Sequence, residues 1–342
     1  MAERIEDIAQ AMVAKGKGIL AADESEGTIA KRFAAIELPV TLETRRDYRE
    51  MLFRSTDAMR DYISGVILTE ETLLQSAADG TPFRALLADV DCIPGIKVDR
   101  GAFTMPGSAD EKITEGLDGL RQRLKHYADV GAGFAKWRGV IAITPNAPTR
   151  NGIRANAHVL ARYAALCQEA GIVPVVEPEV LADGEPGDHS IDRCAEVTAE
   201  TLDAVFQELR LAGVDFSGML LKPNMVLAGV RRRERPGIEE VARRTIEVLR
   251  NHVPATVPGI AFLSGGQSDE EATAHLSAMN QLGPFPWAVT FSYGRALQTA
   301  ALMAWNGDAR NIAKGQAAFT HRAKMNALAS LGEYRPELDI AA

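Results

Sequence analysis

Eight short apolar runs alternate with longer, helix-like segments along the 342 residues, and this order predicts an α/β fold with a parallel sheet. The apolar runs contain few polar residues, as is typical of parallel strands that are buried on both faces. Eight such units in a chain of this length fit a TIM (β/α)8 barrel with extra N- and C-terminal helices. An open, doubly wound sheet is the alternative that the same alternation allows.

The first half of the chain supplies four of the strands and three helical segments. Apolar residues recur at helical spacing in segment 3–15, and 116–129 has a similar amphipathic pattern. Segment 24–52 is also expected to be mostly helical, with lysines and arginines spread along it. The four strands are the short apolar runs at 18–23, 63–68, 93–98 and 134–143.

The second half continues the alternation with four more strands, expected at 172–177, 218–224, 260–263 and 287–291. Helices are expected at 156–171, 191–212, 238–251 and 269–282, after Arg295, and at 310–331. Gly171 provides a stop for the first of these helices. Since we find no internal repeat, low-complexity tract or linker, we expect a single domain over 1–342 with a short tail at 335–342.

Composition and charge argue against several classes of protein. A net charge of -8 and a pI of about 5.4 disfavour nucleic acid or an acidic membrane as a partner. No apolar run approaches the roughly 18 residues of a membrane span, and the N-terminal stretch has no apolar signal core. Cys92, Cys167 and Cys194 are widely spaced, which favours a reducing compartment over a disulfide framework. We therefore expect a cytoplasmic protein.

Motifs for metals and cofactors are missing or lie in the wrong context. The six histidines form neither His-x-x-His nor His-Glu-x-x-His, so no metal site is expected. Segment 16–21 matches the glycine pattern of dinucleotide sites, but it runs into a predicted strand instead of following one. No Walker phosphate loop is present, and we expect no cofactor. The arginine-rich run 231–235 is interpreted as a solvated loop.

Lys222 ends the sixth predicted strand, directly after the apolar run 219–221 and before Pro223. A lysine at the end of a buried strand lies where a hydrophobic wall meets a pocket. Burial disfavours the charged form of the amine, and a neutral amine adds to carbonyl groups and forms Schiff bases. The alternative is a strand-end lysine that reaches into water, because lysine is seldom buried.

Charged residues gather at the ends or in the interiors of five predicted strands. In a TIM barrel, strand ends converge at the C-terminal face, where active sites lie, and alternate residues of one strand share a face. A set of buried ion pairs that stabilises the barrel is the alternative interpretation. The set comprises Asp23, Lys97, Lys136, Arg138, Glu177, Glu179 and Lys222.

The residue types in this set suggest their chemical roles. We expect Lys222 to be the nucleophile and Lys136 to be a second cation that favours its neutral form. Asp23, Glu177 and Glu179 are candidates for proton transfer. Because an imine draws electrons from the adjacent carbon–carbon bond, the predicted reaction class is aldol cleavage or formation.

Two further groups of residues are expected to bind phosphate. In this fold, the loops after strands seven and eight commonly hold phosphate, and glycines there expose backbone N–H groups to an anion. Tight turns and a solvated helix face are the alternatives. The first group comprises Ser264, Gly265, Gly266, Gly294 and Arg295, and the second comprises Lys31, Arg32 and Lys97 near Ser25 and Thr28. Two anion sites at opposite ends of a pocket suggest a bisphosphate.

Seven segments resemble, in the same order, the motifs of class I fructose-1,6-bisphosphate aldolases. They are GKGILAADES at 16–25, GIKVD at 95–99, FAKWR at 134–138, VEPE at 176–179, LLKPNM at 220–225, FLSGGQ at 262–267 and TFSYGRAL at 290–297. The resemblance implies a TIM barrel, usually a homotetramer, that needs no metal. It also implies reversible cleavage of fructose 1,6-bisphosphate to dihydroxyacetone phosphate and glyceraldehyde 3-phosphate, in glycolysis and gluconeogenesis. Small sugar phosphates are then the partners.

The resemblance also implies roles for the matching residues. Lys222 resembles the Schiff-base lysine, Glu177 the acid/base of carbinolamine chemistry, and Asp23 the group that acts on the C4 hydroxyl. Lys136 resembles the cation that positions substrate, supported by Glu179 and Arg138. The C1-phosphate site is matched by Ser264, Gly265, Gly294 and Arg295, and the C6-phosphate region by Ser25, Thr28, Arg32 and Lys97.

The chain departs from the family pattern in two places. Animal members end in a flexible tail with a terminal tyrosine, whereas the last tyrosine here is Tyr334, so another group or water is expected to replace it. Loop 228–236 is unusually rich in arginine, which is expected to affect a subunit contact or access to the pocket. Another Schiff-base lyase or transferase for a sugar monophosphate, such as fructose 1-phosphate, stays open. So does an inactive binding scaffold.

Overall fold

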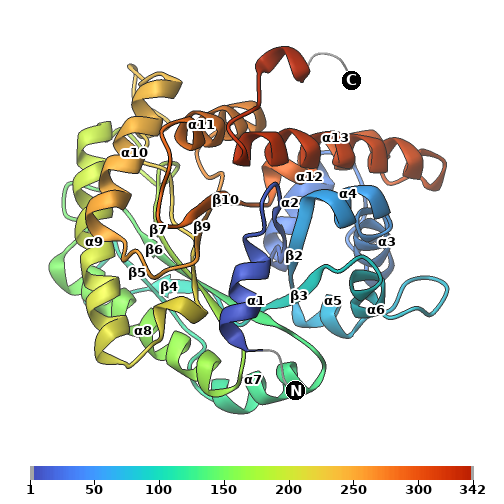
Figure 1. The fold of residues 1–342 in the computed structure, drawn as a ribbon, viewed down its shortest axis with the longest axis horizontal. Coiled ribbons are helices and arrows are strands. Elements are labelled where there is room, and N and C mark those ends of the chain that lie inside the picture. Colours follow the sequence, from blue (N-terminus) through green and yellow to red (C-terminus); the bar gives the residue numbers. More distant parts are fainter. Residues whose placement is uncertain (1–3, 340–342) are drawn as a thin grey trace.

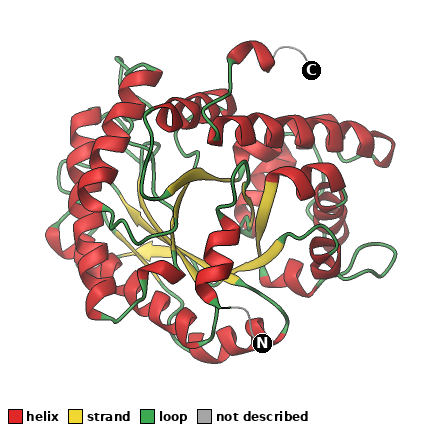
Figure 2. Ribbon diagram, in the orientation of Figure 1, coloured by secondary structure: helices red, strands yellow, loops and turns green. Residues whose placement is uncertain are grey.

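The structure, a computed structural model, describes residues 4–339 and contains the expected barrel. Eight parallel strands close in the order β1-β10-β9-β8-β7-β6-β3-β2, and helices surround them (Figures 1 and 2). The TIM barrel prediction is therefore confirmed, and the doubly wound alternative is wrong. The barrel strands are β1 Gly18–Ala22, β2 Ile63–Leu68, β3 Ile93–Lys97, β6 Phe134–Ile141, β7 Val173–Val180, β8 Leu220–Leu221, β9 Gly259–Phe262 and β10 Ala288–Tyr293.

Helices lie between the barrel strands and at both ends of the chain (Figure 1). Within the described part, no helix combines the length and apolar character that a membrane crossing requires. The α-helices are α1 Ile5–Met12, α2 Glu26–Ala34, α3 Leu42–Phe53, α4 Thr56–Tyr62, α5 Glu70–Leu74, α6 Phe83–Ala88, α7 Leu120–Asp129, α8 Arg150–Glu169, α9 Ile191–Leu211, α10 Ile238–His252, α11 Asp269–Gln281, α12 Arg295–Trp305 and α13 Ile312–Ser330. Short 3-10 turns are η1 Phe216–Gly218, η2 Ala309–Asn311 and η3 Pro336–Leu338.

The hydrophobic core has two parts. The larger part fills the space between the outer faces of the strands and the surrounding helices. The smaller part lies inside the barrel, where α1 packs its buried residues Ile8, Ala9 and Met12 against inward-facing strand residues such as Phe134 and Val173. Helix α1 therefore closes the N-terminal end of the barrel and leaves the C-terminal end, where the strands finish, free for polar groups.

Local capping explains where several helices differ from the sequence prediction. Segment 24–52 is divided into α2 and α3, because Thr41 starts α3 with a capping box that it shares with Thr44. Helix α8 begins at Arg150 and not at 156, because the Thr149 hydroxyl accepts a hydrogen bond from the Gly152 N–H. Helix caps depend on one or two side chains, and hydrophobic periodicity does not record them.

Several short elements were not predicted. Helices α4, α5 and α6 have five to seven residues each, which is too short for a clear helical period. An antiparallel hairpin joins β4 Ala102–Thr104 to β5 Lys112–Thr114 between β3 and β6. Each hairpin strand has three residues, so an alternating pattern has no room to develop. The hairpin is important for function because Ala102 and Lys112 form part of the cavity wall described below.

Candidate active site

A cavity of about 800 Å³ lies at the end of the barrel where the strands finish. The structure brings together there all the predicted site residues except one. Those that line the cavity are Asp23, Ser25, Thr28, Arg32, Lys97, Lys136, Arg138, Glu177, Glu179, Lys222, Ser264, Gly265, Gly294 and Arg295. They come from distant parts of the sequence and meet because all the barrel strands are parallel and end on the same side.

The exception is Gly266, which does not line the cavity. Its φ of +74° lies in the left-handed region, and a Cβ placed there would lie 2.7 Å from the Ala182 Cβ. Glycine is therefore needed at this position to allow the turn after β9. The neighbouring Gly265 serves the cavity more directly, since an added Cβ would lie 3.0 Å from the Glu179 Oε1.

Two buried lysines and two buried carboxylates form the centre of the cavity. The Lys136 Nζ lies 2.7 Å from the Asp23 Oδ2 and 3.2 Å from the Glu177 Oε2. The Lys222 Nζ lies 3.1 Å from the other Glu177 oxygen, Oε1. All four side chains are at most 11% exposed, so these charges interact with little screening by water. Glu177 thus links the two amines, and Asp23 binds only one of them.

The pKa values of three of these groups are displaced toward the charged state. Burial opposes ionisation of Asp23 and Glu177, but the charges of Lys136 and Lys222 outweigh it and hold both carboxyl pKa values below their usual range. Burial also opposes the charge on Lys136, but Asp23 and Glu177 raise its pKa above the usual value. At neutral pH, Lys136 is therefore protonated and both carboxyl groups are ionised.

A second charged pair lies beside this centre. The Arg138 Nε donates to the Glu179 Oε2, and the two residues come from neighbouring strands β6 and β7. Burial disfavours the charge on Arg138, but Glu179 more than compensates and raises the Arg138 pKa. The Glu179 side chain is 6% exposed and that of Arg138 is 44% exposed. The guanidinium therefore faces the open cavity, and the more deeply buried carboxylate pairs with it. Alternate residues on β6 point into the cavity, as the sequence predicted for Lys136 and Arg138.

The loops after β9 and β10 form one wall of the cavity. Ser264 is buried, and its carbonyl accepts a hydrogen bond from the Arg295 Nη2 at 3.4 Å. Gly294 is the N-cap of α12, and therefore the positive end of the helix dipole points at this wall. Arg32 comes from α2, yet its Nη2 lies only 3.3 Å from the position of a Gly294 Cβ. The two predicted anion sites are thus connected through Arg32.

Some cavity residues were not identified from the sequence. The Asp99 side chain is almost fully buried, and its Oδ1 lies 3.5 Å from the Lys97 Nζ. Asp99 follows Lys97 by two residues in the motif GIKVD, and this spacing was the signal in the sequence that could have placed it at the site. Lys112 is an exposed cation on β5 at the cavity wall, and no sequence pattern marked that hairpin. Glu24 directly follows Asp23 and forms ion pairs with Arg32 and with a second arginine behind the cavity.

The arrangement supports carbonyl chemistry by an amine. A buried amine in contact with an ionised carboxylate can lose a proton to it, add to a ketone and form an imine. Across residues 4–339, no three His, Cys, Asp or Glu side chains are grouped in a way that could hold a metal ion.

The fold and the site together define a class of protein, the Schiff-base lyases built on a TIM barrel. The family model of class-I fructose-bisphosphate aldolase matches residues 4–342. The chain belongs to this family.

Individual relatives agree with the family assignment. The chain is 53% identical over 334 residues to a probable fructose-bisphosphate aldolase class 1 of Xanthomonas campestris, covering 97% of this chain and 99% of the relative. It is 49% identical over 345 residues to the fructose-bisphosphate aldolase of Echinococcus multilocularis, covering 100% of this chain and 94% of the relative. A solved structure of fructose-bisphosphate aldolase from Plasmodium falciparum, in complex with TRAP and a small molecule inhibitor, superposes with a TM-score of 0.94 at 49% identity. That match covers 97% of this chain and 95% of the other.

These findings confirm the predictions of fold, family and activity made from the sequence. The protein is a lyase, a fructose-bisphosphate aldolase of the metal-independent class I, which works through a lysine Schiff base. Sugar phosphates are its substrates, and glycolysis is the pathway that the family serves.

Proposed function

We propose that Lys222 forms the Schiff base and that Lys136 stays a charged neighbour. The choice depends on a difference in their surroundings. The Lys136 Nζ has two carboxylates within 3.2 Å, those of Asp23 and Glu177, whereas the Lys222 Nζ has only Glu177 within that distance among the described residues. Since each carboxylate stabilises a protonated amine, Lys136 is held more firmly in the charged form, which leaves Lys222 as the nucleophile. The neutral amine then adds to the C2 ketone of fructose 1,6-bisphosphate.

Glu177 is proposed to move the protons of imine formation. It lies 3.1 Å from the Lys222 Nζ and accepts the proton that the ammonium form gives up before addition. As the neutral amine adds, one of its N–H protons passes to the former carbonyl oxygen and gives the carbinolamine. The proton held by Glu177 then goes to the carbinolamine hydroxyl, which leaves as water. The product is a protonated imine that withdraws electrons from the C3–C4 bond.

Asp23 is proposed to remove the proton of the C4 hydroxyl. As that proton leaves, the C3–C4 bond breaks, its electron pair forms an enamine with the imine carbon, and glyceraldehyde 3-phosphate departs. Lys136, 2.7 Å from Asp23, keeps this carboxylate ionised and in place. Glu179 pairs with Arg138 and holds its guanidinium in position for the substrate. Protonation of the enamine at C3 and hydrolysis of the imine then release dihydroxyacetone phosphate.

The cations and glycines at the cavity wall are proposed to bind the two phosphates. The N-terminus of α12 and Arg295 favour an anion beside Gly294, which supports the C1-phosphate site. The C1 group comprises Ser264, Gly265, Gly294 and Arg295, and the C6 group comprises Ser25, Thr28, Arg32 and Lys97. Arg32 belongs to the C6 group, so its loss should weaken binding of the bisphosphate more than that of fructose 1-phosphate.

Borohydride trapping tests the choice of lysine. Reduction in the presence of dihydroxyacetone phosphate should attach the substrate covalently to Lys222, located by peptide mapping. An adduct on Lys136 would reverse the two roles, and the absence of any adduct would reject the mechanism. Lys222→Arg should keep the fold and lower kcat by about 10⁴-fold or more, because arginine stays charged and forms no imine. Lys125→Arg, an exposed change on α7, is the matched control.

We also propose that the chain is a single domain that assembles as a homo-oligomer, a tetramer as in the family, and that it works in the cytoplasm. The three cysteines are free and buried, which supports a reducing compartment. The exposed Leu211 on α9 is the kind of apolar side chain that a subunit contact covers. Light scattering of the purified protein measures the assembly, and a monomer over the working concentration range would contradict the oligomer.

A further inference from the structure

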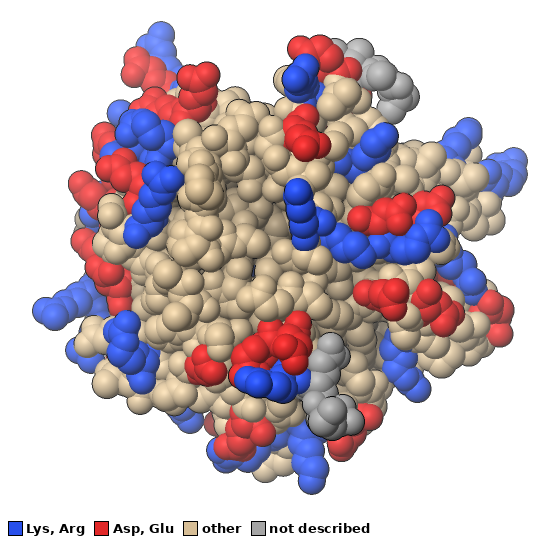
Figure 3. Space-filling view, in the orientation of Figure 1, with Lys and Arg blue, Asp and Glu red and all other residues tan. Residues whose placement is uncertain are grey.

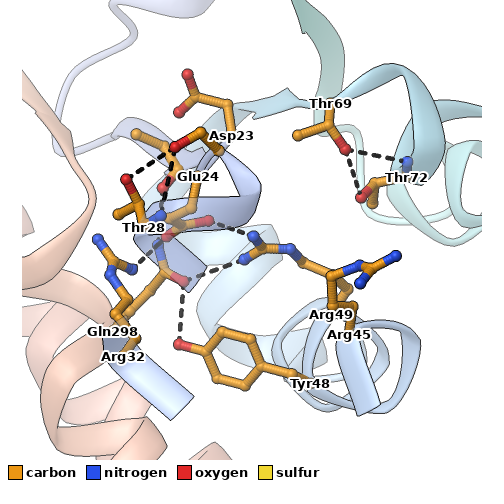
Figure 4. Close-up of polar contacts among 12 residues, drawn as sticks. Asp23, Glu24, Thr28, Arg32, Arg45, Tyr48, Arg49, Thr69, Thr72 and Gln298 are labelled. Carbon is orange, nitrogen blue, oxygen red and sulfur yellow. Dashed lines mark hydrogen bonds and ion pairs between the residues drawn. The ribbon is translucent and has the colours of Figure 1, made fainter. Parts of the chain in front are cut away.

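A buried polar cluster joins Glu24, which lines the cavity, to Tyr48, Arg49 and Gln298 behind the cavity wall (Figure 4). These residues come from the end of β1, from α3 and from the first turn of α12. Glu24 and Arg49 side chains are 4% and 5% exposed, and Gln298 is 1% exposed. Burial of charged and amide groups is costly unless every group has a partner. The contacts of this cluster therefore require an explanation.

Each polar group of Gln298 has a partner. Its Nε2 donates to the Ala21 carbonyl at 2.7 Å and to the Glu24 Oε1 at 2.9 Å. Its Oε1 accepts from the Tyr48 hydroxyl at 3.0 Å and from the Arg49 Nη1 at 3.3 Å. Gln298 thus ties the end of β1 to α12, one helical turn after Arg295.

Glu24 holds two arginines at once. Its Oε1 pairs with Arg32, and its Oε2 pairs with Arg49 (Figure 4). Arg49 is buried behind the wall and absent from the cavity lining, whereas Arg32 lies in the lining with its guanidinium beside Gly294. One carboxylate between two guanidinium groups leaves a net charge of +1. Without Arg49, Glu24 would neutralise Arg32 and remove the excess positive charge that faces the cavity.

We propose that Gln298 and Arg49 are positioning residues for Arg32, acting through the buried carboxylate of Glu24. The inference depends on the phosphate-binding role proposed above for Arg32. A long arginine side chain loses conformational freedom when it binds an anion, and a side chain that is already held in place avoids that cost. Gln298 fixes the Glu24 carboxylate, Arg49 balances its charge, and Glu24 in turn fixes the Arg32 guanidinium.

The structural alternative makes a different prediction. If the cluster only stabilised the barrel, its loss would lower the melting temperature and leave the affinity for substrate unchanged. If it positions Arg32, Gln298→Leu should raise KM for fructose 1,6-bisphosphate about 10-fold, as expected for the loss of hydrogen bonds to a charged group, with kcat within about 2-fold. Arg49→Lys keeps the charge and should recover part of the KM that Arg49→Met loses.

A double-mutant cycle with Arg32→Ala provides the test. In the Arg32→Ala background, Gln298→Leu should have no further effect on KM, because the residue that it positions is gone. An equal KM effect in both backgrounds would overturn the proposal, as would a change in melting temperature alone. If Arg32→Ala by itself leaves KM unchanged, Arg32 does not bind phosphate. That result rejects the proposed role of Arg32, and it rejects the positioning proposal because that proposal depends on this role.

Two further variants keep the proposal testable if Gln298→Leu does not fold stably. Tyr48→Phe removes one hydrogen bond to Gln298 and keeps the ring, and a smaller rise in KM, in the same direction, is expected. Thr273→Val removes the buried hydrogen bonds of a hydroxyl outside the cavity lining, to Asn326, Arg322 and the Asp269 carbonyl, and so matches the loss of buried polar contacts. It should lower the melting temperature without changing KM. A rise in KM for Thr273→Val equal to that for Gln298→Leu would count against a specific role of the cluster.

Discussion

The two ends of the barrel are filled by opposite kinds of side chain. At the C-terminal end, Lys136, Lys222 and Glu177 are buried in contact with one another. At the N-terminal end, α1 packs apolar residues such as Met12 against Phe134 in the barrel interior. Figure 3 shows the face on which α1 lies, where lysine, arginine and acidic side chains lie mainly toward the periphery and the centre is largely uncharged.

The contrast teaches how one fold can both be stable and hold reactive charges. Apolar burial contributes roughly 25 cal/mol per Å² and needs no specific geometry. Buried charges contribute little net stability, because desolvation offsets their attraction. Apolar burial at the closed end therefore offsets the cost of keeping two amines and two carboxylates away from water at the cavity end.

The largest effect is expected when the charge balance of the cavity end is broken. Lys136→Met leaves Asp23 and Glu177 buried with Lys222 as the remaining cation at the centre. Removal of one partner from a buried ion cluster costs about 3–5 kcal/mol. At pH 7 we expect a loss of unfolding free energy of that size, measured by urea denaturation, together with a severe loss of kcat. Lys125→Met on the surface is the control.

The pH dependence of this variant has a definite sign. In the parent protein, the folded-state pKa values of Asp23 and Glu177 are lowered. Their contribution to stability is therefore present above the unfolded value of about 4 and is lost as pH falls through the folded values. In Lys136→Met, burial without that cation raises the pKa of at least one carboxyl group, so stability falls relative to the parent as pH rises from 5 to 7. A variant whose stability follows that of the parent over this range would contradict the prediction.

A change at the apolar end should affect stability and spare the chemistry. Met12 on α1 is fully buried, and Met12→Ala is expected to cost about 2–5 kcal/mol through lost contacts and the cavity left behind. Because α1 lies at the opposite end from the cavity, KM and kcat below the melting temperature should stay within about 2-fold. A selective change in KM would show that the two ends are coupled.

The smallest effect is expected at the exposed rim of the cavity end. Lys112 on β5 is exposed and lines the cavity. Lys112→Ala should raise KM for the bisphosphate about 2- to 3-fold at low ionic strength, because an exposed charge contributes little and acts mainly on encounter with the substrate. The effect should disappear at about 0.5 M salt, where exposed charges are screened. An effect that persists in salt would place Lys112 in direct contact with phosphate. Lys112→Arg, which keeps the charge, is the matched control.

Much of the cavity could be predicted from the sequence because it depends on local rules. Each predicted site residue lies within a barrel strand, in the loop that follows it or on the next helix. Parallel strands of a closed barrel bring those ends together whatever the details of packing. For the same reason, the alternation along β6 was sufficient to place Lys136 and Arg138 on one face of the strand. Chain order and hydrophobic period thus determined the fold and most of the membership of the cavity.

Only the tertiary structure decided which of these groups touch. Gln298 bonds to Glu24 across 274 positions of the sequence, and Arg49 bonds to Gln298 across 249. Such contacts form when the barrel closes β10 against β1, and no local pattern records them. The same holds for Lys222, whose single close carboxylate distinguishes it from Lys136, because charge interaction depends on distances of a few ångströms between strands. Sequence determined the residues available for chemistry, and closure of the barrel determined their partners.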